Sequence, residues 1–298
     1  MKHAWTLTKV RMRLALRNRA FIIFSLFIPL LFLFLFVGLL AHDDPAAVGY
    51  RLASVLSLTV MGSFWGLSVQ LVTFREQGIL RRFRLTPVGA GAMLASSILS
   101  NYLMTLPIVL IEFAVARFVF HMQGWGNLLG IAALVTLGMT AFPALGLIVA
   151  SVTNTMQETQ LINQLLWWFF LLLSGATVPL PILPDWLQSV ALFVPATYLV
   201  AGLQTVLTGR GGITAIGPEL LALAVSTGVA FFVSQQLFRW EAETKVPRRA
   251  KLWAASALIP FILLGIWETS RNRLRSTALM DYMSIQPQSD TARPDANK

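Results

Sequence analysis

The sequence contains no cysteine and only three histidines among its 298 residues. Missing thiols exclude disulfides, thiolate metal sites and cysteine nucleophiles. No histidine pair has the spacing of a helical zinc motif such as HExxH, and no phosphate-binding loop of the G-x-x-x-x-G-K-S/T type is present. A membrane enzyme acting on lipids would need clustered acids or histidines, which the sequence lacks. We therefore predict that this chain is not an enzyme and does not itself bind ATP.

Charge is also scarce, since 12% of the residues are charged and 56% are apolar. A soluble surface cannot be built from this composition. Apolar runs long enough to cross roughly 30 Å of hydrocarbon as helices lie near residues 21–41, 53–73, 94–118, 128–150, 160–178 and 219–238. Residues 21–40 show no alternating polarity of a barrel strand. The sequence predicts an all-α polytopic membrane protein, with six transmembrane helices in one domain, residues 1–240.

The few charges are mostly positive, with a net charge of +10. Nucleic-acid binding is one reading of such a charge, but the positions favour the cytoplasmic bias of Lys and Arg in membrane proteins. The basic residues gather before the first apolar run, after the second and after the sixth: Lys2, Lys9, Arg11, Arg13, Arg17, Arg19, Arg75, Arg81, Arg82, Arg84, Arg239, Lys245, Arg248, Arg249 and Lys251. The opposite connections carry only Arg51 and Arg210. We expect a cytoplasmic N-terminus and no nucleic-acid partner.

Residues 241–298 form a basic C-terminal extension with an apolar segment at 252–267, flanked by Trp253 and Trp267. As a helix this segment would reach only about 24 Å, and Pro260 interrupts it. A crossing would also place Arg271, Arg273 and Arg275 on the outer side. We interpret the segment as an interfacial or partly inserted helix, and residues 284–298 as a disordered tail.

Residues 174–198 are apolar but broken by Pro179, Pro181, Pro184 and Pro195. Proline inside a helix removes a hydrogen bond and clashes with the preceding turn. Broken backbone at membrane depth is tolerated only where protein or water satisfies it. We predict an external re-entrant helical hairpin between the fifth and sixth spans.

Polar residues occur within two of the apolar runs. Glu112 lies toward the outer half of the third run, where an ionisable residue is a functional candidate. It fits a hydrogen bond to another helix, a place on the transport path, or the proton carrier of a gradient-driven secondary transporter. In the fifth run one helix face carries Gln160, Asn163, Gln164, Trp167 and Ser174. These residues fit hydrogen bonds between packed helices or a cleft that substrate passes.

Small residues recur in the fourth run at Gly130, Ala133, Gly138, Ala141 and Gly146. Small side chains let the backbones of neighbouring membrane helices approach closely. We expect this run to pack tightly inside the bundle.

The loop after the second run reads FREQGILRRFRLTP, residues 74–87. Its composition predicts a short helix from Arg75 to Leu85 that ends before Pro87. Ile79, Leu80 and Phe83 would share one side of that helix, with arginines elsewhere around it. An ordinary basic loop is the simpler interpretation, but a loop needs no apolar face. A basic helix with such a face suits docking onto a partner protein.

Two patterns in a fixed order carry a family resemblance. The first is Glu76, Gly78, Leu80, Leu85, Thr86 and Pro87; the second is Ser174, Gly175, Pro179, Leu183, Pro184, Trp186, Leu187, Pro195, Thr197 and Tyr198. Together they resemble ABC-2 type transporter permeases over residues 1 to about 240. Within this family the chain is most similar to compact bacterial drug or antibiotic export permeases, because the outer loop after the first run is too short to hold a large external domain.

The resemblance implies an exporter subunit in the bacterial plasma (inner) membrane that moves an amphiphilic drug or natural product, with glycans or other cargo as alternatives. It implies a homodimer, or a heterodimer with a related permease, bound to two cytoplasmic ATPase subunits. Those subunits would bind ATP and Mg, while this chain would hold no cofactor or metal.

The resemblance also implies roles for particular residues. Coupling to the ATPase would involve Arg75, Glu76, Gly78, Leu80, Arg82, Phe83, Thr86 and Pro87, and residues 151–159 would form a second cytoplasmic contact. The polar face of the fifth run and Glu112 would line the substrate path or dimer cleft. The outer gate would comprise Pro179, Pro184, Trp186, Leu187, Pro195 and Tyr198. The basic N-terminal stretch would be an interfacial connecting helix, and Gln204 stands where family members often carry a basic residue.

Overall fold

The chain is described by a computed structural model over residues 2–39, 45–83, 89–209, 212–240, 256, 259–271 and 273–283. All regular elements within these ranges are helical. In chain order they are α1 (Lys2–Arg17), α2 (Arg19–Leu33), η1 (Phe34–Leu39), α3 (Pro45–Glu76), α4 (Ile79–Phe83), α5 (Ala90–Phe118), α6 (Leu128–Val152), α7 (Met156–Leu173), η2 (Leu180–Ile182), α8 (Asp185–Ala191), α9 (Pro195–Leu207), α10 (Gly217–Gln236), α12 (Ile259–Arg271) and α13 (Arg273–Met283).

Among the described residues, 5 helical stretches are long and apolar enough to cross a membrane: Ile22–Leu39, Ala47–Glu76, Ala90–Phe118, Leu128–Val152 and Gly217–Gln236. They coincide with five of the six predicted spans, and the chain is an all-α polytopic membrane protein. The predicted span at 160–178 was wrong in its bounds, because α7 ends at Leu173. Gly175 adopts a φ of 85° just beyond it, a conformation that cannot continue a right-handed helix.

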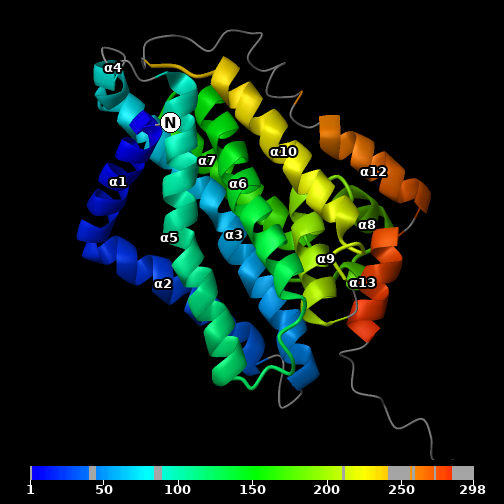
Figure 1. Ribbon diagram of the computed structural model, residues 1–298. Helices are drawn as coiled ribbons and strands as arrows, with labels where there is room; N and C mark the ends of the chain where they lie inside the picture. Colours follow the sequence, from blue (N-terminus) through cyan, green and yellow to red (C-terminus); the bar gives the residue numbers. More distant parts are fainter. Residues whose placement is uncertain are drawn as a thin grey trace, which may run out of the picture.

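The centre of the bundle is α6, which packs against α3 on one side and α10 on another (Figure 1). Close approach depends on glycine at two points. A Cβ at Gly138 would lie 2.7 Å from a Val60 methyl carbon, and one at Gly146 would lie 2.3 Å from the Phe64 carbonyl oxygen. The predicted tight packing of this run is confirmed at these positions.

Gly146→Ala is therefore expected to lower the thermal stability of the purified protein. The added methyl would meet backbone of α3, and overpacking of this kind costs about 1 to 3 kcal/mol. Gly228→Ala on α10 is the matched control, because no atom lies within 4 Å of its Cβ position. Thermal unfolding in detergent is the measurement, and equal midpoints for the two variants would contradict the packing argument.

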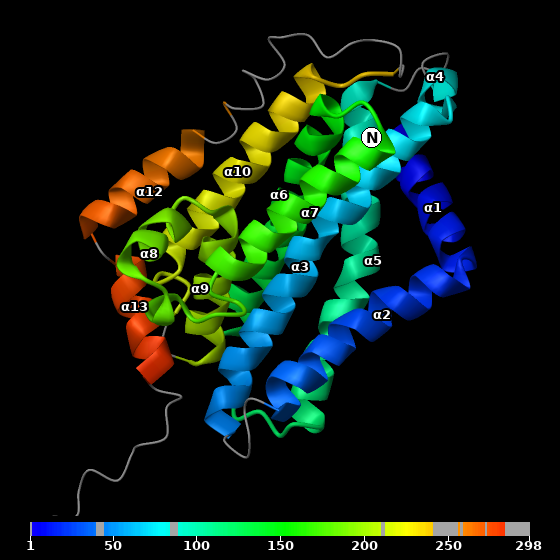
Figure 2. The same ribbon diagram turned by 180° about the vertical axis from the view of Figure 1, so that it is seen from behind.

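Helix α1 lies alongside α5, and the chain bends sharply between α1 and α2 (Figures 1 and 2). The contact is polar: Arg11 donates to the Ser97 hydroxyl and to Met93 Sδ, and Thr8 donates to the Ser96 carbonyl. Burial lowers the pKa of Arg11 to about 10. Trp5 and Leu14 are exposed. This outward apolar surface fits the interfacial connecting helix that the resemblance implies.

The C-terminal helices follow an unexpected course. Helix α12 packs against α10, and α13 packs against η2 and α9 (Figures 1 and 2). The chain after residue 270 therefore lies against the proline-rich hairpin. The charges of its arginines are accommodated: Arg273 pairs with Glu219 and Glu268, Arg275 donates to Ser189, and Arg271 lies 5.3 Å from the centre of the Trp267 ring.

Candidate functional site

The segment after α3 folds as two pieces rather than as the single predicted helix from Arg75 to Leu85. Gly78 has a φ of 68°, and its N–H donates to the Arg75 carbonyl at 3.1 Å. Glycine adopts this left-handed conformation without a steric penalty. The chain therefore turns between α3 and the short α4. The predicted coupling residues Thr86 and Pro87 lie outside the described residues.

Arg75 is the centre of the basic end, by which we mean α4, residues 153–155 and the adjoining ends of α3 and α10. Its side chain is buried and donates to the carbonyls of Ala150 at 2.9 Å, Thr153 at 2.7 Å and Asn154 at 3.4 Å. Glu76 accepts from the Met156 N–H at 2.8 Å. The two stretches predicted as separate cytoplasmic contacts are thus joined by the last residues of α3.

Arg239 completes this cluster from the chain that follows α10. It donates to the Thr153 carbonyl at 2.5 Å and to Asn154 Oδ1 at 3.2 Å. Burial lowers the pKa of Arg239, and the nearby Glu158 carboxylate partly offsets this effect. Sequence reasoning counted Arg239 only among the orienting charges. No local pattern could have revealed its partners, which lie about 85 residues away along the chain.

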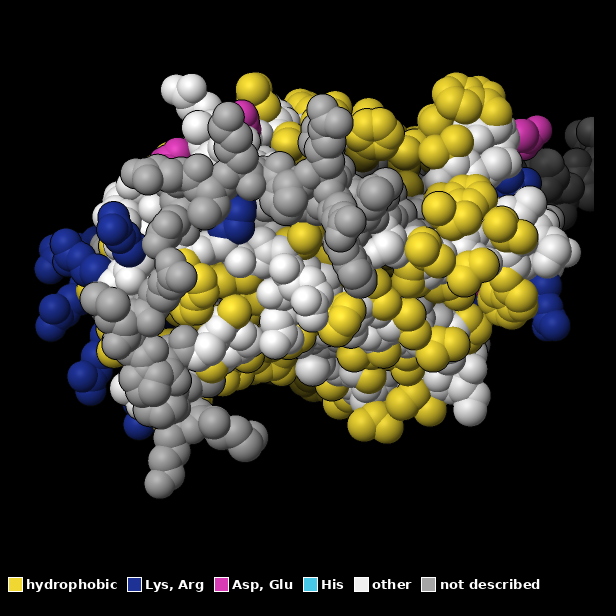
Figure 3. Space-filling model, turned by 90° about the horizontal axis from the view of Figure 1, so that it is seen from above, with side chains coloured by type: hydrophobic (Ala, Val, Ile, Leu, Met, Phe, Trp, Pro, Cys, Tyr) yellow, Lys and Arg dark blue, Asp and Glu magenta, His cyan; other side chains and the backbone are white. Residues whose placement is uncertain are grey.

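Helix α4 turns its apolar side toward its own chain. Leu80 is fully buried in a cluster that includes Leu71 and Val72, and Phe83 is partly buried against the same cluster. Arg81 and Arg82 are exposed. Leu80 thus fills the chain's own core, and the docking of this face onto a partner stays a prediction. The surface that α4 presents is basic, and Figure 3 shows Lys and Arg side chains concentrated at the left edge of the view, with a few elsewhere.

The polar residues predicted to share one face of the fifth run have different surroundings in the structure. Asn163 is buried and donates to the Ser68 hydroxyl at 2.7 Å, which links α7 to α3. Trp167 is half-buried and lies beside Gly62 of α3. Gln160 and Gln164 are exposed. Ser174 is buried beyond the helix and accepts from the Ala176 N–H at 3.2 Å, so it does not share the exposed face.

Glu112 is fully buried and accepts a 2.6 Å hydrogen bond from Thr59, which joins α5 to α3. Its other carboxylate oxygen has no hydrogen-bond partner among the described residues. Arg117, five residues further along the chain, donates to the Met122 carbonyl at 2.6 Å and not to Glu112. Of the three readings of Glu112, this geometry favours a hydrogen bond between helices.

The proline-rich segment forms η2, α8 and α9, which we call the hairpin. Helices α8 and α9 meet at 95°. Pro179 and Pro184 precede η2 and α8, and Pro195 is the first residue of α9, so each proline stands where its missing N–H costs no helical bond. Trp186 is 68% exposed and Leu187 half-buried.

Tyr198, a predicted gate residue, has its side chain fully buried inside the hairpin. Its hydroxyl donates to the Leu192 carbonyl at 2.8 Å and fixes the turn between α8 and α9. Thr197 donates to the Ala191 carbonyl at 2.7 Å and supports the same turn. Tyr198 therefore shapes the hairpin from within and offers no surface to a substrate.

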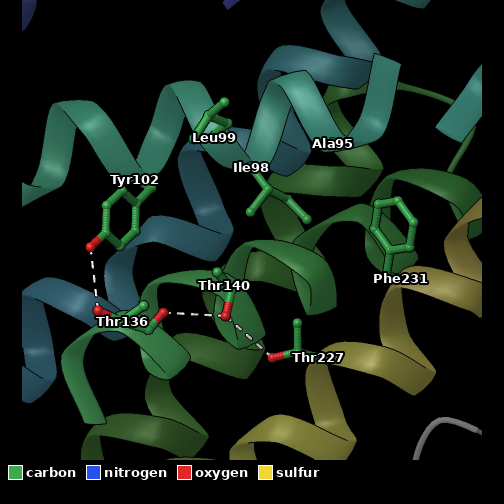
Figure 4. Close-up of a pocket in the computed structure, with 8 residues that line it drawn as sticks. All are labelled: Ala95, Ile98, Leu99, Tyr102, Thr136, Thr140, Thr227 and Phe231. Carbon is green, nitrogen blue, oxygen red and sulfur yellow. Dashed lines mark hydrogen bonds between the residues drawn. The ribbon is translucent and has the colours of Figure 1, made fainter. Parts of the chain in front are cut away.

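A groove of about 370 Å³ lies between α5, α6 and α10 (Figure 4). It is lined by Ala95, Ile98, Leu99, Tyr102, Thr136, Thr140, Thr227 and Phe231. Its hydroxyl groups pair with one another, Tyr102 with Thr136 at 3.3 Å and Thr140 with Thr227 at 3.4 Å, so the surface left to a ligand is apolar. Sequence reasoning did not find this groove. In the described part of the chain, no group of three or more His, Asp or Glu side chains could hold a metal ion.

The family model of the ABC-2 type transporter matches residues 2–208. The transport permease YvfS of Bacillus subtilis is 24% identical over 212 residues, which cover 66% of this chain and 82% of that protein. The linearmycin resistance permease protein LnrN of B. subtilis is 26% identical over 186 residues (60% and 47%). The inner membrane transport permease YhhJ of Escherichia coli is 23% identical over 197 residues (66% and 52%). This chain thus spans about half the length of LnrN and YhhJ.

Proposed function

Because the chain belongs to the ABC-2 type transporter family, we propose that it is the permease subunit of an ATP-driven exporter whose separate ATPase subunits dock at the basic end. The exposed Arg81 and Arg82 of α4 would meet the ATPase. The Lys and Arg bias supports a cytoplasmic location for this end. The hairpin would then lie on the outer side of the bacterial inner membrane.

The observation that carries the proposal is the bonding around Arg75. A partner that moves α4 also moves the end of α3. Arg75 and Glu76 tie that end to residues 150–156, which join α6 to α7. A displacement at the ATPase surface would therefore reach α7 through hydrogen-bonded groups. Differential contacts of the ATP-bound and ATP-free partner with α4 would shift the permease between two states.

We propose a homodimer, or a heterodimer with a related permease, with α7 facing the second subunit. Along α7 the side chains of Leu161, Leu165, Trp168 and Leu172 are each between 49% and 73% exposed. Apolar exposure alone would suit lipid, but the exposed Gln160 and Gln164 on the same helix would not. A cleft between two copies would give these amides a polar surrounding on the substrate path.

The proposed cargo is an amphiphilic drug or natural product. LnrN, which is named a linearmycin resistance permease protein, supports a role in resistance. The predominantly apolar helices suit a cargo that partitions into the bilayer. Glycan export by the same machinery is the alternative cargo.

The test is reconstitution in proteoliposomes with an ATPase subunit encoded beside this chain. We expect a stable complex and amphiphile efflux that requires ATP and continues after the ion gradient is collapsed. Efflux that needs no ATP and stops on collapse of the gradient would instead support a secondary transporter with Glu112 as its proton carrier. Failure of every neighbouring ATPase subunit to bind would also refute the proposal.

A further inference from the structure

Helices α12 and α13 lie beyond residues 2–208, the part that matches the family, yet they contact the hairpin directly. In Figure 1, α12 runs beside α10, and α13 lies beside α8 and α9. Figure 2 shows the same neighbours from behind. The C-terminal segment therefore lies where it can act on the hairpin.

A cluster of three charged side chains fixes this arrangement. One guanidinium nitrogen of Arg273 lies 2.6 Å from Glu268 of α12 and 2.8 Å from Glu219 of α10. The second oxygen of Glu268 accepts from the Leu274 N–H at 3.2 Å. Arg273 is thus the point at which α10, α12 and α13 are joined.

The two carboxylates of this cluster are buried, and the guanidinium group is partly exposed. The Glu268 and Glu219 side chains are 0% and 4% exposed, whereas Arg273 is 28% exposed. Burial alone would lower the pKa of Arg273, but the attraction of the two carboxylates outweighs this and raises it. Removing one partner of a buried ion pair is strongly unfavourable, because the remaining charge is left uncompensated.

The other side of α13 holds the hairpin through apolar contacts. Leu274 packs in a buried cluster with Leu192 and Tyr198, and Ala278 packs in another with Leu180 and Ala191. Arg275 adds a 2.5 Å hydrogen bond to Ser189 of α8. The first cluster also includes Ala222 of α10, which therefore lies at the boundary between α10 and α13.

We propose that α12 and α13 form a strap that holds the hairpin closed against α10, with Arg273 as its positioning residue. The inference rests on the proposed function, in which the hairpin is the outer gate. Because the contacts of α13 with η2 and α8 are buried, these three elements move as one body, while α9 stays packed against α3, α6 and α10. The gate then opens where Arg273, which is partly accessible to water, separates from Glu219.

The absence of native cysteine allows a direct test with Ala222→Cys, a position of α10 that is fully buried against Leu192 and Leu274. The permease alone, in sealed vesicles, is treated with a membrane-impermeant maleimide on the hairpin side. We expect slow labelling when the native Arg273 is present. Labelling should be about tenfold faster with Arg273→Gln, and its rate should be intermediate with Arg273→Lys. A tenfold change corresponds to about 1.4 kcal/mol, less than the cost of breaking a buried pair.

Arg271→Gln is the matched control, because it removes the same charge from an exposed side chain outside the cluster. Equal rates for Arg273 and Arg273→Gln, or an equal increase with Arg271→Gln, would overturn the strap. If Arg273→Gln does not fold, Glu219→Gln is measured in its place, with the same two outcomes. This labelling requires neither ATPase nor substrate, so its failure leaves the proposed function untouched.

A second readout separates gating from simple stabilisation. In the reconstituted complex, Arg273→Gln is expected to raise ATPase activity in the absence of substrate, and Arg273→Lys to restore the low rate. Faster labelling of Ala222→Cys without a change in this basal rate would overturn the gating role. Failure of the complex to form would refute the proposed function and leave the labelling result standing.

Discussion

Replacing Arg75 with methionine is expected to uncouple ATP hydrolysis from transport and to lower the stability of the permease. Methionine keeps an unbranched apolar chain but donates no hydrogen bond. Each buried carbonyl left without a donor costs about 1 to 3 kcal/mol. The Ala150 carbonyl loses its donor, whereas the Thr153 carbonyl keeps Arg239, so a loss of about 1 to 3 kcal/mol is expected. The measurement is the free energy of unfolding in detergent.

Arg75→Met should also weaken the coupling between the ATPase subunit and the permease. Arg75 and Glu76 are the polar links between α3 and the turn that begins α7. Coupling free energies of about 1 to 3 kcal/mol correspond to changes of roughly 5- to 150-fold. Substrate-stimulated ATPase activity should therefore fall at least about tenfold, while the ATPase still binds through α4.

Arg81→Met is the matched control, because Arg81 belongs to the same segment but is exposed. It should leave the free energy of unfolding unchanged within about 0.5 kcal/mol. Arg75→Lys should restore activity only in part, since one ammonium group cannot reach three carbonyls as a guanidinium fork does. Full stimulation of the ATPase by the Arg75→Met permease would show that the hydrogen-bonded turn carries no coupling.

The different outcomes at Arg75, Leu80 and Tyr198 show what the sequence can predict. Apolar length and proline positions are local properties, so the spans and the broken hairpin could be predicted from them. The direction of a side chain depends on packing between distant segments. Arg75 and Tyr198 carry polar groups and suggested exposed contacts, yet both are buried and bonded to backbone carbonyls.

The C-terminal strap marks a second limit. Each of Arg271, Arg273 and Arg275 favours the cytoplasmic side when it is counted as an isolated charge. The bias does not describe a cation whose partners are buried carboxylates. Glu219 stands in the first turn of α10 and Glu268 near the end of α12, and only the fold brings both to Arg273. A separation of 54 residues between Arg273 and Glu219 leaves no trace in local sequence.

Charge reversal at Arg82 is expected to prevent docking of the ATPase while leaving the permease folded. Arg82 is exposed on α4, so Arg82→Glu disturbs no buried contact. Placing a like charge against an acidic partner surface costs several kcal/mol. Because each 1.4 kcal/mol is about tenfold in affinity, binding should weaken by at least about 100-fold, and the remaining binding should respond less to added salt.

The affinity of the purified subunits, measured at two salt concentrations, tests this prediction. Arg13→Glu provides the same charge change on an exposed position of α1, and it should weaken binding by less than about threefold. Arg81→Glu should behave like Arg82→Glu if the whole basic surface of α4 is used. Undiminished binding of both α4 variants would place the ATPase elsewhere. Because Leu80 fills the chain's own core, the remaining described contact surface at this end would then be residues 153–158.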